Sequence, residues 1–136
     1  MNPEKLIELA KQAMARAYAP YSGYQVGAAL LCEDGTVYQG CNIENASYTP
    51  TVCAERSAFF KAVYDGKRAF RAIAVCGGRA GVIAGVFPPC GVCRQVMREF
   101  CKDDFLIYMA DAGDTYRTYT LAQLLPCSFS GGEHMR

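Results

Sequence analysis

Two short cysteine-containing segments constrain this chain more than any other feature. Residues 53–55 read Cys-Ala-Glu, and residues 89–93 read Pro-Cys-Gly-Val-Cys. Both segments are typical of helix beginnings. Cys90 and Cys93 are three apart, so at a helix start they face the same way and can share one metal ion. Residues two apart on a regular helix point to different sides. Cys53 and Glu55 can therefore both face the metal only if Cys53 occupies the non-helical position just before the helix.

Thiolates are preferred zinc ligands, and three of them leave one coordination position for water, which is the pattern of a catalytic zinc site. Glu55 is then the predicted proton carrier. No fourth protein ligand is apparent, because the only histidine, His134, lies in a C-terminal segment, residues 130–136, that we expect to be flexible. The sequence therefore predicts one Zn²⁺ per chain, with three ligands: Cys53, Cys90 and Cys93.

The charge of such a site requires compensation. Three thiolates and one Zn²⁺ carry a net charge of −1, which resists the lowering of the pKa of a bound water. Arg56 and Arg94 follow the two metal segments and are the candidates for the compensating charge. Arg56 lies one helical turn after Cys53 and could donate hydrogen bonds to its sulfur. The alternative for either arginine is a solvated helix charge.

Composition narrows the class of protein. A chain of 136 residues predicts a single domain, residues 1–136, with its own core. The net charge is +1 and no basic run is present, which argues against a nucleic-acid partner. No apolar stretch is long enough to span a membrane, and the N-terminus does not resemble a signal peptide, so we expect a cytoplasmic protein with no membrane partner.

The chain contains eight cysteines. In a cytoplasmic protein of this size, clustered cysteines favour metal binding over disulfides. The other five occur singly among apolar residues, and we expect them to be small buried side chains: Cys32, Cys41, Cys76, Cys101 and Cys127.

Hydrophobic periodicity and turn residues predict helices at 4–18, 53–65, 90–101 and 121–125, strands at 24–32, 37–41, 70–76, 105–109 and 115–119, and a loop at 77–87. This order predicts an α/β layer arrangement around a mixed five-stranded sheet. Right-handed crossovers place helices 53–65 and 90–101 on the same face. Both begin beyond the carboxyl ends of their preceding strands, where α/β folds carry their sites.

Segments 53–55 and 89–95 together resemble the signature of zinc-dependent nucleoside and nucleobase deaminases, in its three-cysteine form. Further stretches resemble the small, homotetrameric cytidine deaminases, and with them the resemblance covers nearly the whole chain. These stretches are 19–22, 26–30, 40–46 and the region from Leu124 to Phe129.

The resemblance implies a three-layer α-β-α fold and hydrolytic deamination of cytidine and 2′-deoxycytidine at C4 of the ring. Glu55 would take the proton of a zinc-activated water, protonate N3 and help the amine leave. Asn42 and Glu44 match the pair that binds the ribose 3′-hydroxyl. The resemblance also implies a homotetramer with its sites at subunit interfaces.

Four more residues take expected roles from the resemblance. Ala54 would contact the substrate, Gln95 would support the zinc ligands, and Phe129 matches an aromatic residue contributed across the subunit interface. Tyr24 stands where the family usually has phenylalanine against the base. Its hydroxyl needs a partner or water, because an unpaired buried polar group costs about 1–3 kcal/mol. The alternative for Tyr24 is a strand aromatic in the core.

Other functions are compatible with parts of the pattern. A deaminase of nucleoside antibiotics such as blasticidin S shares the zinc motifs, but the pair Asn42 and Glu44 suits an ordinary ribose. A deaminase of tRNA or single-stranded DNA would normally offer a histidine ligand and a more basic surface. A redox protein using Cys90-x-x-Cys93 would leave segment 53–55 unexplained. A structural zinc module would need a fourth ligand, such as Cys41 or Cys76.

Overall fold

The computed structural model describes residues 1–131 of the chain, and in it five strands form one sheet in the order β2-β1-β3-β4-β5. The strands are β1 (Tyr24–Cys32), β2 (Val37–Cys41), β3 (Phe70–Arg79), β4 (Leu106–Ala110) and β5 (Tyr116–Thr120). The helices are α1 (Pro3–Met14), α2 (Ala54–Tyr64), α3 (Gly91–Phe100), the short α4 (Leu121–Leu124) and the 3₁₀ turn η1 (Ala112–Asp114). Only β3 and β4 are parallel, so the sheet is mixed, as predicted.

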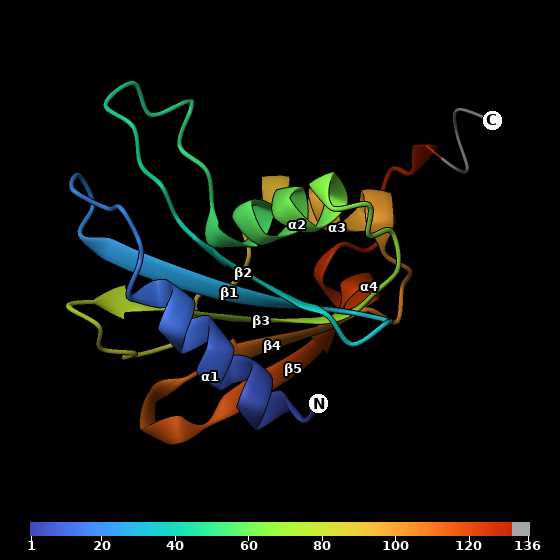
Figure 1. Ribbon diagram of the computed structural model, residues 1–136, viewed down its shortest axis with the longest axis horizontal. Helices are drawn as coiled ribbons and strands as arrows, with labels where there is room; N and C mark the ends of the chain where they lie inside the picture. The colour runs from blue at the N-terminus through green and yellow to red at the C-terminus, as the bar shows by residue number, and fades with distance from the viewer. Residues whose placement is uncertain (132–136) are drawn as a thin grey trace.

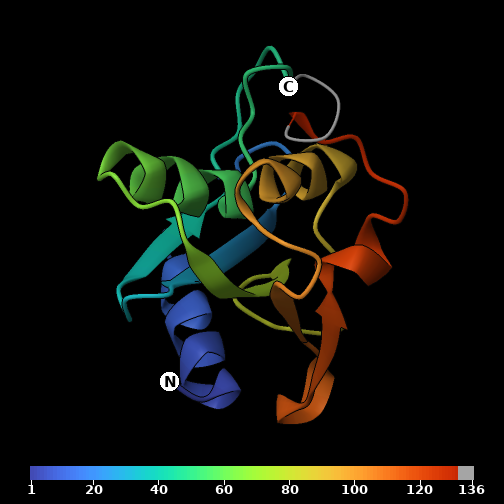
Figure 2. The ribbon, with the colours of Figure 1, turned by 90° about the vertical axis from the view of Figure 1, so that its right-hand side faces the viewer.

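The helices form layers on both faces of the sheet (Figures 1 and 2). α1 covers one face, while α2 and α3 lie side by side on the other. Each face has its own apolar cluster: Phe59, Ile73, Met97 and Ile107 are fully buried on the α2 and α3 side, and Leu6 and Ala10 of α1 pack against Ala29 and Ala74 on the other. The predicted α/β arrangement and the shared face of α2 and α3 are confirmed.

A glycine in β2 sets how closely α2 approaches the sheet. A Cβ atom at Gly40 would lie 2.4 Å from the carbonyl oxygen of Ala54 and 2.5 Å from the amide nitrogen of Ala58. These are backbone atoms, so only glycine lets the first turn of α2 rest directly on β2. That turn carries Ala54 and Glu55 of the Cys-Ala-Glu segment. The position of these two residues therefore depends on Gly40.

The first predicted helix was too long at its C-terminal end. α1 ends at Met14 rather than at residue 18. The amide of Tyr18 instead donates to the carbonyl of Asn42 at 3.0 Å, and the amide of Glu44 donates to the carbonyl of Tyr18 at 2.9 Å. Pairing with a segment more than twenty residues away is a tertiary effect that outweighs local helical periodicity.

The third strand is longer than predicted. β3 continues to Arg79 because Gly77 and Gly78 pair with Val26 and Gln25 of β1, and Arg79 itself pairs with Tyr24. The loop expected at 77–87 therefore starts only after Arg79.

Two expectations about burial were wrong. Cys127 is exposed and Cys41 is half-buried, whereas the other three single cysteines are buried, as expected: Cys32, Cys76 and Cys101.

No helix within residues 1–131 combines the length and hydropathy needed to cross a membrane. His134 and most of the segment expected to be flexible, 130–136, lie outside the described residues.

Candidate metal centre and pocket

The N-termini of α2 and α3 meet, and each is capped by a cysteine. Cys53 precedes α2 with φ −75° and ψ 157°, and Cys90 precedes α3 with φ −68° and ψ 167°. The extended backbone of Cys53 is the non-helical first position that its spacing from Glu55 predicts. Cys93 lies in the first turn of α3, is 1% exposed, and its amide donates to the Cys90 sulfur at 3.4 Å.

The three sulfurs form a cluster that fits a zinc ion. The Sγ atoms of Cys53, Cys90 and Cys93 all lie within 4.8 Å of one another, and those of Cys53 and Cys90 are 3.6 Å apart. Tetrahedral zinc with Zn–S bonds of about 2.3 Å separates its sulfur ligands by roughly 3.8 Å, so these positions suit three zinc ligands.

The thiols considered as a fourth ligand are occupied elsewhere. The Cys41 sulfur donates to the carbonyl of Arg16 at 3.5 Å, and the Cys76 sulfur lies 3.8 Å from the sulfur of Met14. Neither belongs to the cluster. Within residues 1–131 the thiol cluster has three members, which argues against a closed structural zinc module.

The surroundings favour the thiolate at Cys53. Its pKa is lowered to about 5, first by a hydrogen bond from the Cys93 thiol and then by hydrogen bonds from Arg56 and Cys90. The same hydrogen bond, together with burial, raises the pKa of Cys93, so the anion resides on Cys53. Partial positive charge at two helix N-termini acts in the same direction. Thiolate is the form that binds metal.

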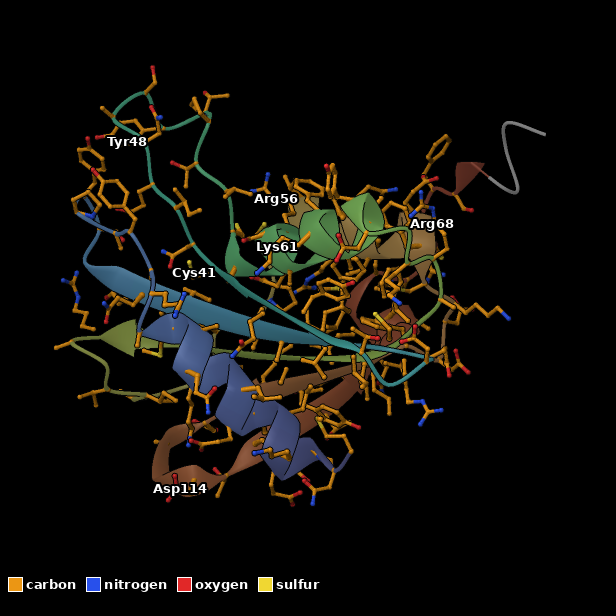
Figure 3. The ribbon with its side chains drawn as sticks, viewed as in Figure 1. Cys41, Tyr48, Arg56, Lys61, Arg68 and Asp114 are labelled. Atoms are coloured by element: carbon orange, nitrogen blue, oxygen red, sulfur yellow. The ribbon has the colours of Figure 1, made fainter. Side chains whose placement is uncertain are left out.

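The two arginines near the cluster have different partners. Nη2 of Arg56 lies 3.4 Å from the Cys53 sulfur, and Figure 3 shows Arg56 on α2. Its buried Nε has no hydrogen-bond partner among the described residues. Arg94 donates to the carbonyls of Pro89 and Leu124, both at 2.8 Å, and joins the start of α3 to α4. The geometry favours Arg56 as the group that balances thiolate charge.

Glu55 lies in the first turn of α2, where its side chain is 4% exposed. Burial raises the pKa of Glu55 to about 7. A carboxyl group with a pKa near neutrality can both accept and release a proton, as general acid–base catalysis requires.

Glu55, Cys53 and Cys90 line a cavity of about 180 Å³. Its other lining residues come from β1, the two segments preceding α2 and α3, and the start of α2: Val26, Asn42, Thr51, Val52, Ala54, Phe87 and Pro88. Our sequence predictions did not include Phe87, because glycine and alanine dominate the stretch 77–87 that precedes the metal segment. The position of this phenylalanine just before Pro-Pro-Cys was the sequence signal that could have placed it at the site.

Asn42 is anchored to the backbone of β1. Its Oδ1 accepts from the amide of Val26 and its Nδ2 donates to the carbonyl of Tyr24, both at 2.8 Å. A side-chain amide has two N–H donors and two acceptor lone pairs. One N–H and one lone pair of Asn42 therefore remain for another ligand at the edge of the cavity.

Glu44 anchors the segment that leads into β1. One carboxylate oxygen accepts from the amides of Tyr21 and Ser22 at 2.9 and 3.1 Å, and the other accepts from the Ser22 hydroxyl. The Ser22 hydroxyl bond is the main reason that the pKa of Glu44 is lowered. The Ser22 oxygen in turn accepts from the amide of Tyr24 at 3.0 Å, which links Glu44 to the start of β1.

The remaining predicted residues lie around this site. Tyr24 is 41% exposed, so it is not a core aromatic, and its ring contacts Phe87. Ala54 is fully buried and lines the cavity. Gln95 donates to the carbonyl of Phe129 at 3.1 Å, and Phe129 is 57% exposed.

A larger hollow of about 660 Å³ lies between α1, β2 and α2. The metal-ligating cluster found among residues 1–131 is not part of its lining. The smaller cavity is the one that combines possible metal ligands with a buried acid, and we assign the candidate site there.

Residues 1–109 match the family model described as the cytidine and deoxycytidylate deaminase zinc-binding region. The chain belongs to this family. The deaminase resemblance inferred from segments 53–55 and 89–95 is thereby confirmed. The family description names a zinc-binding region, and the cluster of Cys53, Cys90 and Cys93 is able to hold that metal.

Relatives and solved structures of the deaminase family are similar over nearly the full chain. A cytidine deaminase of Sporosarcina psychrophila is 52% identical, covering 96% of this chain and 93% of its own length. One from Halalkalibacterium halodurans is 48% identical over 96% of both chains. The crystal structure of cytidine deaminase from Burkholderia pseudomallei superimposes with a TM-score of 0.87 at 46% identity, covering 95% of this chain and 100% of that chain. The predicted fold is therefore confirmed.

Proposed function

We propose that this chain catalyses the hydrolytic deamination of cytidine and 2′-deoxycytidine to uridine and 2′-deoxyuridine, with release of ammonia. The observation that carries the proposal is the convergence of a three-thiol cluster and the buried acid Glu55 on one cavity. Two relatives that are 52% and 48% identical over nearly their whole length carry the name cytidine deaminase and support the same substrate class.

Glu55 is the proton carrier in this proposal. Cys53, Cys90 and Cys93 would hold the zinc, which when bound would supply Lewis-acid activation of a water molecule. Glu55 accepts one proton from the water and delivers it to N3 of the cytosine ring as the water oxygen bonds to C4. It then takes the remaining proton from the new C4 hydroxyl and passes it to the amine, so that the C4–N bond breaks, the C4 carbonyl forms and ammonia leaves. A pKa raised to about 7 suits a group that must act first as a base and then as an acid. Arg56 stabilises the thiolate of Cys53 through its hydrogen bond.

The cavity is suited to a base rather than to a whole nucleoside. Its volume of about 180 Å³ is smaller than the roughly 300–1,000 Å³ of pockets that bury drug-sized ligands. The pyrimidine ring occupies the cavity, and the ribose lies at its edge beside Asn42 and Glu44. The remaining N–H and lone pair of Asn42 and the Glu44 carboxylate then bind the 3′-hydroxyl. Ala54 and Tyr24 contact the base.

The proposal includes a cytoplasmic homotetramer with its sites at subunit interfaces. Phe129 then completes the site of a neighbouring subunit, and Gln95 holds the segment that carries it by donating to its carbonyl. The exposed position of the Phe129 ring supports this role, because large exposed apolar side chains commonly mark interfaces.

The decay of the cytidine absorbance band in the presence of the purified protein tests the activity directly. We expect turnover of cytidine and deoxycytidine, loss of turnover after treatment with a strong zinc chelator, and recovery when zinc is restored. Absence of turnover in protein that contains one zinc per chain would contradict the proposed function.

A further inference from the structure

The guanidinium of Arg79, the last residue of β3, lies over the ring of Tyr24, the first residue of β1. The two residues are register partners in the antiparallel pair, and Cζ of Arg79 is 4.1 Å from the ring centroid. Figure 1 shows the start of β1 and the end of β3 at the same end of the sheet. No carboxylate of residues 1–131 forms an ion pair with Arg79. The Tyr24 ring is therefore the group that holds the guanidinium in place, by a cation–π interaction.

The Tyr24 ring is also in contact with the wall of the cavity. Its centroid lies 5.6 Å from that of Phe87, with the ring planes inclined by 50°. Phe87 lines the cavity together with Cys53 and Glu55. A continuous series of contacts thus leads from the exposed Arg79 through Tyr24 to the cavity wall.

Two glycines near the end of β3 make room for the contacts among Arg79, Tyr24 and Phe87. A Cβ atom at Gly77 would lie 2.7 Å from the ring of Phe87, so glycine provides the space in which that ring lies. At Gly78 a Cβ atom would lie 1.8 Å from the carbonyl oxygen of Val82. The chain after Arg79 folds back closely here, and the amide of Val82 donates to the carbonyl of Arg79 at 2.9 Å. Gly77 thus leaves room for the Phe87 ring, and Gly78 leaves room for the returning chain.

We infer that Arg79 is a positioning residue for nucleoside binding: its guanidinium holds the Tyr24 ring against Phe87 and so maintains the aromatic wall at the mouth of the cavity. The inference rests on the proposed function. Arg79 makes none of the contacts described around the zinc ligands or Glu55, so it acts on the affinity for cytidine and leaves the chemical step unchanged.

Steady-state kinetics of Arg79→Gln provide the first test. An exposed cation–π contact contributes about 0.5–1 kcal/mol, so we expect KM for cytidine to rise about two- to five-fold with kcat unchanged. Arg79→Lys keeps the cation and should restore most of the affinity. Arg71→Gln is the matched control, because Arg71 is an exposed arginine of the same strand that pairs with Glu33, and its KM should equal that of the wild type.

A double-mutant cycle tests whether Arg79 acts through the ring. Tyr24→Leu removes the ring, so adding Arg79→Gln to it should produce no further rise in KM. An unchanged KM in Arg79→Gln, a fall in kcat alone, or an equal rise in KM with and without the Tyr24 ring would each overturn the inference.

Calorimetric binding of cytidine in the Glu55→Gln background separates this inference from the proposed function. If the wild type fails to turn over cytidine, the proposed function is contradicted, and the dissociation constant still reports on Arg79. A weaker dissociation constant in Glu55→Gln/Arg79→Gln, again by about two- to five-fold, supports the inference. An equal dissociation constant, or no binding of cytidine in either variant, overturns it.

Discussion

At the scale of the residue, Glu55 shows how burial creates a reactive group from a common one. A helix carboxylate in water is ionised at neutral pH, but with 4% exposure the pKa of Glu55 rises to about 7. Its neighbour Cys53 experiences the opposite effect, since hydrogen bonds from Cys93 and Arg56 lower its pKa to about 5. The two shifts suit the proposed tasks of the two groups, which are proton transfer for Glu55 and metal binding for Cys53.

Glu55→Gln tests the role of the carboxylate. The amide is nearly isosteric and leaves the three thiols intact, so we expect about one zinc per chain to be retained. General acid–base catalysis typically contributes about 10²–10⁴-fold to the rate, so kcat should fall by about 10²-fold or more. Zinc content from elemental analysis and turnover from the absorbance assay are measured on the same sample. Near wild-type kcat in the zinc-loaded variant would remove Glu55 from the mechanism.

At the scale of the element, the site depends on how closely α2 approaches β2. The N-terminus of α2 brings Cys53 and Glu55 to the site, and α3 brings Cys90 and Cys93. A small displacement of α2 therefore changes the distance from the Cys53 thiol to the other two thiols. Gly40 sets this approach through its contacts with the backbone of Ala54 and Ala58.

Gly40→Ala should displace the start of α2. The added Cβ meets backbone atoms at 2.4 and 2.5 Å, and overpacking of this kind costs typically about 1–3 kcal/mol of the free energy of unfolding. We expect that loss in urea denaturation, together with weaker zinc retention. Gly85→Ala is the control, because no atom lies within 4 Å of its added Cβ, and its stability should be close to that of the wild type. Equal stabilities for the two variants would show that α2 can move without penalty.

At the scale of the whole molecule, the loop of residues 42–51 carries apolar side chains into solvent. Tyr48 is 75% exposed, and its ring meets that of Tyr21 at a centroid distance of 6.5 Å. Figure 3 shows Tyr48 on the part of this loop that projects from the sheet. Tyr18 and Ile43, at its base, are 56% and 47% exposed. Clustered exposed apolar residues mark contact surfaces, and these lie beside Asn42 and Glu44.

Size-exclusion chromatography with light scattering on the eluted protein tests the proposed tetramer. Four chains of 14.8 kDa give a mass of about 59 kDa, and we expect that species to carry the activity. Tyr48→Ser should shift the population to smaller species and reduce activity in proportion. Tyr64→Ser, at the end of α2 and 91% exposed, is the control that should remain tetrameric. A fully active species of 14.8 kDa would contradict the assembly.

Local spacing was sufficient to predict the metal segments. Cys53 and Glu55 two residues apart, and Cys90 and Cys93 three apart after a proline, already imply capped helix starts that face one metal ion. The family and the fold inferred from these motifs are confirmed by the family match and the solved structures. The roles of individual site residues stay predictions for the experiments above.

The sequence by itself determined the chemistry of this protein, because zinc ligation and proton transfer depend on residue types held a few positions apart. Tertiary structure alone decided the shape of the pocket around that chemistry. The pairing of Tyr18 with residues 42–44 ended α1 early, and the extension of β3 paired Arg79 with Tyr24, whose ring also contacts Phe87. These contacts join residues far apart in the chain, and their energies are not visible in local periodicity. The Cys-Ala-Glu and Pro-Cys-Gly-Val-Cys segments were readable from the sequence, whereas the aromatic wall beside them was not.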